Sequence, residues 1–157
     1  MAASAVQLGL IGLGTVGTGV VQLLARHSDA ITRKLGRSLR FARVASRSLH
    51  TRPHPDLGAA RLSADPWTVV HDPEVEVVIE LIGGIEPARS LVLEAISRGK
   101  DVVTANKALL ALHGEEIFAA AEARGVSVGF EASVAGGIPI IRTLREGLAA
   151  DRNRALF

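Results

Sequence analysis

The sequence of 157 residues contains no cysteine and no tyrosine, and its only aromatic residues are four phenylalanines and one tryptophan. Without thiols the chain forms no disulfide, holds no metal through thiolates and has no cysteine nucleophile, which fits a reducing compartment. No apolar run approaches the roughly 18 residues that a membrane span needs, and the N-terminus lacks the pattern of a signal peptide. We therefore expect a cytoplasmic protein without a membrane partner.

Acidic residues are also missing from one long stretch, between Asp29 and Asp56. The overall net charge of +2 excludes nothing, but this window is strongly basic. Phe41 is the only aromatic residue in it, so stacking on nucleic-acid bases is not expected, and a phosphorylated small molecule is the favoured partner. A solvated basic face is the alternative. The basic residues of the window are Arg33, Lys34, Arg37, Arg40, Arg43, Arg47 and Arg52.

Short apolar runs alternate with segments of helical spacing along the whole chain. A buried strand is expected at 6–11 and a helix from Thr15 to about Leu35, where Gly36 stops it. Further strands are expected at 39–45, 75–82, 101–104 and 126–130, and further helices at about 65–71, 87–98 and 106–124.

This alternation predicts an α/β fold of the Rossmann type, a doubly wound and mostly parallel sheet with helices on both faces. With 48% hydrophobic residues, the chain can bury the core of one domain with a small attachment. We expect a dinucleotide-binding domain over 1–134. Residues 135–157 read as the start of a second domain that stops early.

Gly12, Gly14 and Gly17 match the pattern G-x-G-x-x-G between the first strand and its helix. In this position the first glycine permits a tight turn, the second lets the backbone approach a pyrophosphate, and the third allows close packing of helix on strand. Amides at the helix start and the helix dipole favour the negative charge. A glycine-rich turn without a ligand is the alternative.

The end of the second strand favours NADP over NAD, although NAD remains possible. An NAD site usually has an acidic residue there, whereas this chain has Ser46, Arg47 and Ser48. The Arg47 guanidinium matches the oxygens of a 2′-phosphate, with Arg52 as a possible helper. The alternative is that Arg47 is a plain surface arginine.

Three further residues stand where parallel strands end. Thr104 ends a strand and Lys107 follows it, so both are expected near the sheet edge where ligands of this fold bind, and both are assigned to the cofactor site. Lys107 is also the candidate catalytic residue, although its spacing alone favours function only slightly. Glu80 has apolar neighbours and is either paired near a strand end or part of the binding crevice.

Four segments resemble the homoserine dehydrogenases, which interconvert aspartate 4-semialdehyde and homoserine with NAD(P)H. They are residues 12–17 (GLGTVG), 78–84 (VIELIGG), 103–111 (VTANKALLA) and 130–141 (FEASVAGGIPII). The last two are far more specific than the first. Together they span almost the whole chain.

The resemblance implies that Thr15 and Val16 contact the pyrophosphate, Arg47 the 2′-phosphate, and Lys107 the nicotinamide and substrate. It also implies a sodium site, a homodimeric full-length protein, and that residues 135–157 are the start of a truncated catalytic and dimerisation domain. A hard cation suits carbonyl oxygens in a bent loop, and a bare hinge is the alternative. The implied sodium ligands, mainly backbone carbonyls, are Glu131, Val134, Gly136 and Ile138.

The implied function is hydride transfer in threonine and methionine biosynthesis, acting on a small-molecule substrate and not on nucleic acid. The family's substrate-binding acidic residues and principal lysine lie in a C-terminal part that this chain lacks, so we expect cofactor binding with little or no turnover. A nucleotide-sensing module would explain the glycine pattern but not Lys107. A Rossmann dehydrogenase acting on a related semialdehyde or imine is the remaining alternative.

Overall fold

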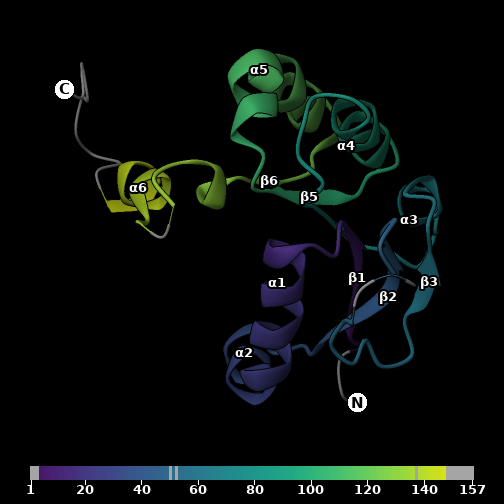
Figure 1. The fold of residues 1–157 in the computed structure, drawn as a ribbon. Coiled ribbons are helices and arrows are strands. Elements are labelled where there is room, and N and C mark those ends of the chain that lie inside the picture. Colours follow the sequence, from purple (N-terminus) through teal and green to yellow (C-terminus); the bar gives the residue numbers. More distant parts are fainter. Residues whose placement is uncertain (1–3, 50, 52, 137, 148–157) are drawn as a thin grey trace.

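The computed structural model describes residues 4–49, 51, 53–136 and 138–147. Its strands form one sheet in the order β3-β2-β1-β4-β5-β6, and every strand pair is parallel. The predicted α/β fold is therefore confirmed (Figure 1). The elements are β1 (Val6–Ile11), α1 (Thr15–Arg26), α2 (Ser28–Leu35), β2 (Leu39–Ala45), β3 (Arg61–Ser63), α3 (Trp67–Val70), β4 (Val77–Glu80), α4 (Ala88–Ser97), β5 (Asp101–Thr104), α5 (Lys107–Arg124), β6 (Val128–Gly129), the 3₁₀ turn η1 (Glu131–Ser133), α6 (Ile140–Arg142) and the π-helical turn η2 (Thr143–Gly147).

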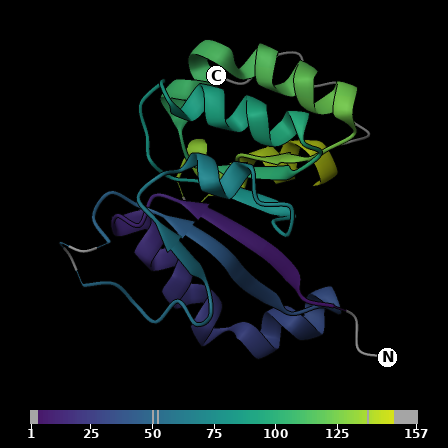
Figure 2. The same ribbon diagram turned by 90° about the vertical axis from the view of Figure 1, so that its right-hand side faces the viewer.

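Helices cover the two faces of the sheet separately, as Figure 2 shows. Val21 of α1 packs on one face, together with Leu10 of β1 and Val44 of β2. On the other face, Leu91 of α4 and Ile117 of α5 belong to a second buried cluster. Because both faces are covered, the central strands are apolar on both sides, as the run at 77–79 predicts.

The chain reverses its direction of travel across the sheet at β1. Strand β2 pairs with one side of β1, and β4 pairs with the other. Gly12 follows β1 and Leu81 follows β4, so the turns after these two strands are neighbours, and the amide of Leu81 donates to the carbonyl of Ile11 at 2.8 Å. In open parallel sheets, ligands bind at the carboxyl ends of the strands at such a reversal.

Two expectations about local structure are wrong. The helix expected from Thr15 to about Leu35 is interrupted at His27, whose φ of −111° and ψ of 15° lie outside the helical range, so α1 and α2 are separate helices. Strand β3 lies between residues 45 and 65, where no strand or helix was expected. It has only three residues and only partial burial, so its pairing with β2 determines it more than its own sequence pattern does.

The segment after β6 leaves the sheet and leads to α6 (Figure 1). The Glu131 carboxylate accepts hydrogen bonds from the amides of Ile141 and Arg142, at 2.9 and 3.0 Å. One side chain thus connects the turn after β6 to the start of α6. Among the residues that the structure describes, no helix has the length and apolar character needed to cross a membrane.

Candidate dinucleotide site

Each of the three glycines in the turn between β1 and α1 has a different steric environment. Gly12 has a φ of +102°, and a Cβ there would lie 2.7 Å from the carbonyl oxygen of Leu81. A Cβ on Gly17 would overlap the carbonyl oxygen of Gly12. A Cβ on Gly14 would meet nothing within 4 Å, so this position faces open space. The geometry agrees with the tight turn, close packing and ligand approach expected of the pattern.

No side chain in the described part of the chain satisfies the first amides of helix α1. Its N-cap is Gly14, no side-chain capping bond is present, and the first turn has no acidic residue. Thr15 and Val16 are exposed, with Val16 at 57%. The first turn of a helix has unpaired amide donors and a partial positive charge, so this end of α1 suits a phosphate group.

Arg47 lies exposed just beyond the end of β2, and it forms no ion pair with any residue in the described part of the chain. The turn around it is held by Ser46, whose Oγ accepts from the amide of Ser48 at 3.3 Å and whose amide donates to the carbonyl of Ser63. A free guanidinium on a fixed turn suits a phosphate ligand. The possible helper Arg52 lies outside the described residues.

The basic residues at 33–47 are divided between ion pairs and separate parts of the fold, and they do not form one surface. Arg37 pairs with Glu76 at 3.2 Å, and Arg43 pairs with Asp72 at 2.7 Å. The basic residues of α2 follow the carboxyl end of α1, far from the glycine turn (Figure 1). Among the described basic residues of this window, only Arg47 lies just beyond the carboxyl end of a strand. The direction of the strand separates it in space from residues that are close to it in the sequence.

Thr104 lies at the centre of a buried hydrogen-bond network. Its hydroxyl donates to Glu80 Oε2 at 2.7 Å and accepts from the amide of Asn106 at 3.0 Å. Ser133, which the sequence did not link to this place, donates through Oγ to the carbonyl of Thr104 at 2.9 Å. Thr104 is completely buried. Its hydroxyl would contact a cofactor only if these bonds opened, so its cofactor-binding role stays a prediction.

Glu80 is the last residue of β4 and is also completely buried. Its Oε1 accepts from the amides of Ile82 and Gly83, at 2.9 and 3.2 Å. With the bond from Thr104, the carboxylate therefore has three neutral donors. Glu80 is therefore paired near a strand end, the first of the two interpretations of the sequence, and its part in a binding crevice stays a prediction.

Lys107 is the first residue of α5 and is exposed at the carboxyl edge, as expected. Asn106 caps this helix through Oδ1, which accepts from the amide of Leu109 at 3.1 Å. The Asn106 side-chain amide donates to the carbonyl of Gly84 at 2.6 Å. One side chain therefore fixes both the helix start that carries Lys107 and the turn after β4.

The predicted sodium ligands lie in the bent segment after β6. Ala135 and Gly136 have φ values of 54° and 62°, which turn the backbone sharply. The carbonyls of Glu131 and Ile138 already accept amide hydrogen bonds, at 3.1 and 2.8 Å, although each oxygen has a second lone pair. The described side chains include no cluster of three or more metal-binding groups. The sodium site, which would use backbone carbonyls, stays a prediction.

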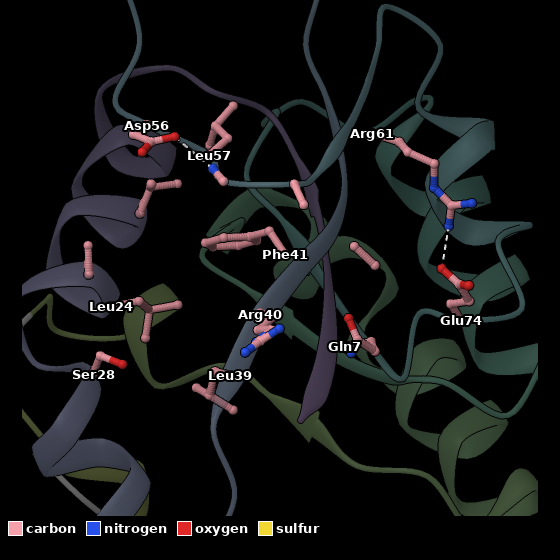
Figure 3. Close-up of a pocket in the computed structure, with 15 residues that line it drawn as sticks. Gln7, Leu24, Ser28, Leu39, Arg40, Phe41, Asp56, Leu57, Arg61 and Glu74 are labelled. Carbon is pink, nitrogen blue, oxygen red and sulfur yellow. Dashed lines mark hydrogen bonds and ion pairs between the residues drawn. The ribbon is translucent and has the colours of Figure 1, made fainter. Parts of the chain in front are cut away.

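A cavity of about 720 Å³ lies beside the amino half of β2 (Figure 3). Leu24, Phe41 and Leu57 lie along one side of it, and Arg61 pairs with Glu74 on the other. It shares no lining residue with the glycine turn or Arg47. The cavity is therefore separate from the candidate site.

Comparison with known proteins connects this geometry to one family. The family model described as "Homoserine dehydrogenase, NAD binding domain" matches residues 12–131. The homoserine dehydrogenase of Pseudomonas aeruginosa is 53% identical over 149 residues, which cover 94% of this chain and 33% of that protein. The chain thus spans about a third of the length of this curated relative.

Solved structures agree with the sequence matches. A homoserine dehydrogenase from Thiobacillus denitrificans has a TM-score of 0.88 and 52% identity, covering 97% of this chain and 35% of that one. A hyperthermophilic archaeal homoserine dehydrogenase, solved in complex with NADPH, has a TM-score of 0.74. Its identity of 22%, over 94% of this chain and 50% of that one, shows likeness of fold alone.

Proposed function

This chain belongs to the homoserine dehydrogenase family, and we propose that its glycine turn, Arg47 and Lys107 form the NADP(H) site of such an enzyme. The observation that carries the proposal is the start of α1, where Gly14 faces open space and none of the described side chains caps the first amides. The matching family model, described as an NAD binding domain, supports the same ligand class.

Each residue has a distinct part in the proposed site. The amides of Thr15 and Val16 donate to the pyrophosphate, and the Arg47 guanidinium binds the 2′-phosphate. Lys107 presents its ammonium at the nicotinamide end, where it orients the substrate and stabilises negative charge on its oxygen. The bound cofactor supplies the hydride.

The activity of the whole protein is part of the proposal, because the chain spans about a third of its relatives. It is the NAD(P)-dependent interconversion of aspartate 4-semialdehyde and homoserine by a cytoplasmic homodimer. Residues 1–134 form the dinucleotide-binding domain and residues 135–157, of which 148–157 lie outside the described residues, begin the next domain. Glu131, Val134, Gly136 and Ile138 hold the sodium ion.

Calorimetric titration of the purified chain with NADPH and NADH tests the cofactor site. NADPH is expected to bind more tightly, and its affinity should fall as salt screens the phosphate contact. Arg47→Ala is expected to weaken NADPH binding by about tenfold or more, because a hydrogen bond to a charged group contributes about 1.5–3 kcal/mol. Binding of NADH should stay nearly unchanged.

Arg40→Ala is the matched control, since Arg40 is an exposed arginine of the same basic window but lines the separate cavity. It should leave both affinities within about twofold. Failure of the wild-type chain to bind either cofactor would contradict the proposed function. Equal weakening by the two arginine variants would contradict the assignment of Arg47.

A further inference from the structure

Glu80 lies under the half of the proposed site that faces away from Arg47. All three of its hydrogen-bond donors lie at the carboxyl edge of the sheet: Ile82 and Gly83 in the turn after β4, and Thr104 at the end of β5. None belongs to the helices that cover the core. The carboxylate therefore organises the ligand-facing edge and not the packing of helix on sheet.

The turn after β4, residues 81–84, is the first element that Glu80 holds. This turn touches the glycine turn, since a Cβ on Gly12 would lie 2.7 Å from the Leu81 carbonyl oxygen and 3.0 Å from Ile82 Cγ2. Gly83 and Gly84 both have positive φ values, of 70° and 75°. Two successive glycines leave the turn with many accessible conformations, so external hydrogen bonds are needed to select one.

The start of α5 is the second element. Thr104 donates to Glu80 and accepts from Asn106, which in turn donates to the carbonyl of Gly84. The bonds thus form a closed circuit from β4 through Thr104 and Asn106 back to the turn after β4. Lys107 follows directly, so its position depends on this circuit.

We propose that Glu80 is a positioning residue for the nicotinamide half of the dinucleotide. This inference rests on the proposed function. Glu80 holds the turn at 82–84 and the start of α5, so that Lys107 and Ile82 contact the nicotinamide in one fixed arrangement. Preformed surfaces bind more tightly because the ordering cost is met before binding. The adenosine half, bound by Arg47, does not depend on Glu80.

Glu80→Gln is the primary variant. The glutamine side chain has one acceptor oxygen and one amide donor, so it cannot accept from both loop amides and the Thr104 hydroxyl through two oxygens. Its affinity for NADPH should fall by about tenfold, and the nicotinamide fluorescence on binding should shift toward that of free NADPH. Its affinity for 2′,5′-ADP, which lacks the nicotinamide half, should change by less than about twofold.

Thr104→Val and Thr104→Ser form a second, independent pair if Glu80→Gln does not fold. Valine keeps the shape of threonine but removes the hydroxyl, so it should reproduce the selective loss of NADPH affinity. Serine keeps the hydroxyl and should restore most of the affinity. Glu116→Gln is the matched control, because it removes an exposed carboxylate that pairs with Arg89 on the surface.

Titrations of all variants with NADPH and with 2′,5′-ADP, beside thermal melts, decide the proposal. A loss confined to NADPH, present in Thr104→Val and reversed in Thr104→Ser, supports it. Equal losses for both ligands, or no loss for either, overturn it, since a merely structural role would weaken both together. If the wild-type chain binds neither NADPH nor 2′,5′-ADP, the proposed function is wrong, and this inference is wrong with it.

Discussion

Asp72 and Glu80 are buried carboxylates at opposite ends of β4, and they bind different kinds of donor. Asp72 comes before the strand and accepts from Arg43 Nε and Arg61 Nη2, each at 2.7 Å. Glu80 ends the strand and accepts only from backbone amides and a hydroxyl. Cationic arginines thus stabilise the Asp72 carboxylate, whereas neutral dipoles stabilise the Glu80 carboxylate.

The surrounding charges follow the same division. Near Asp72, buried Lys100 donates to the carbonyls of Asp72 and Val75, each at 2.6 Å. At the carboxyl edge of the sheet, neither Lys107 nor Arg47 forms an ion pair with a residue in the described ranges. Charges before the strand stabilise the fold, whereas cations beyond it remain available to an anionic ligand.

The largest effect is expected from Gly17→Ala, which tests how tightly the backbone packs at the carboxyl end. The new Cβ would overlap the Gly12 carbonyl oxygen, so α1 must move away from β1. We expect a loss of about 3 kcal/mol or more of unfolding free energy, as for overpacking against rigid atoms. Urea denaturation measures it, and an unchanged midpoint would contradict the packing described for this turn.

Asp72→Asn should give the next largest effect, at the other end of β4. Asparagine keeps the size but leaves Arg43 without a charged partner and Arg61 with the exposed Glu74 alone, and we expect a loss of about 2 kcal/mol, reduced by the partial exposure of both arginines. Urea denaturation at neutral pH measures the loss. Glu74→Gln is the control, since its pair with Arg61 is exposed and should contribute less than about 1 kcal/mol.

The same carboxylate predicts a pH dependence of stability. Burial alone would raise the pKa of Asp72, but the hydrogen bond from Arg43, the Glu74 amide and the charge of Arg61 together hold the pKa below its ordinary value. Because the folded state has the lower pKa, this stabilisation is complete above the ordinary value and is lost as pH falls through the lowered one. Melts between about pH 7 and pH 2 should show a smaller acid loss in Asp72→Asn than in the wild type.

Gly14→Ala should separate binding from folding at the carboxyl end. Gly14 has negative φ, and a Cβ there meets nothing within 4 Å, so the melting temperature should stay nearly unchanged. The methyl group would occupy the approach of the pyrophosphate, and NADPH affinity should fall by about tenfold. An unchanged NADPH affinity, measured by calorimetry, would contradict phosphate binding at this turn.

The smallest effect is expected from Arg33→Ala combined with Lys34→Ala. Both residues are exposed on α2, beyond the end of α1 that is remote from the glycine turn. NADPH affinity at moderate salt should change by less than about twofold, because screening weakens charge interactions beyond roughly 8–10 Å. A larger loss would show that the basic residues between Asp29 and Asp56 together attract the cofactor.

Several features of the fold were predictable because they depend on neighbours in the sequence. The helix expected at about 106–124 is confirmed, with Asn106 as the cap of α5 and Gly125 at its end, since capping joins residues within one turn of helix. β3 and the interruption at His27 were missed. The strand needs β2 as its partner, and residues 15–35 keep helical spacing on both sides of the break.

The candidate site divides in the same way. The glycine pattern, Arg47 and Lys107 are local signals, and each residue lies at the carboxyl edge as predicted. The bonds from Ser133 to Thr104 and from Asn106 to Gly84 join residues 29 and 22 positions apart. No spacing rule predicts such pairs.

The sequence by itself determined the parallel α/β fold, the glycine turn and the family, because these depend on periodicity, on turn chemistry and on extended identity. Only the tertiary structure decided which charges are paired and what Glu80 binds. Arg43 and Arg47 are only four positions apart, but the direction of β2 places them in different environments. Arg43 lies beside Asp72, and Arg47 is exposed to solvent. Hydrogen-bond partners are set by distances in space, which the parallel pairing of β1, β4 and β5 fixes.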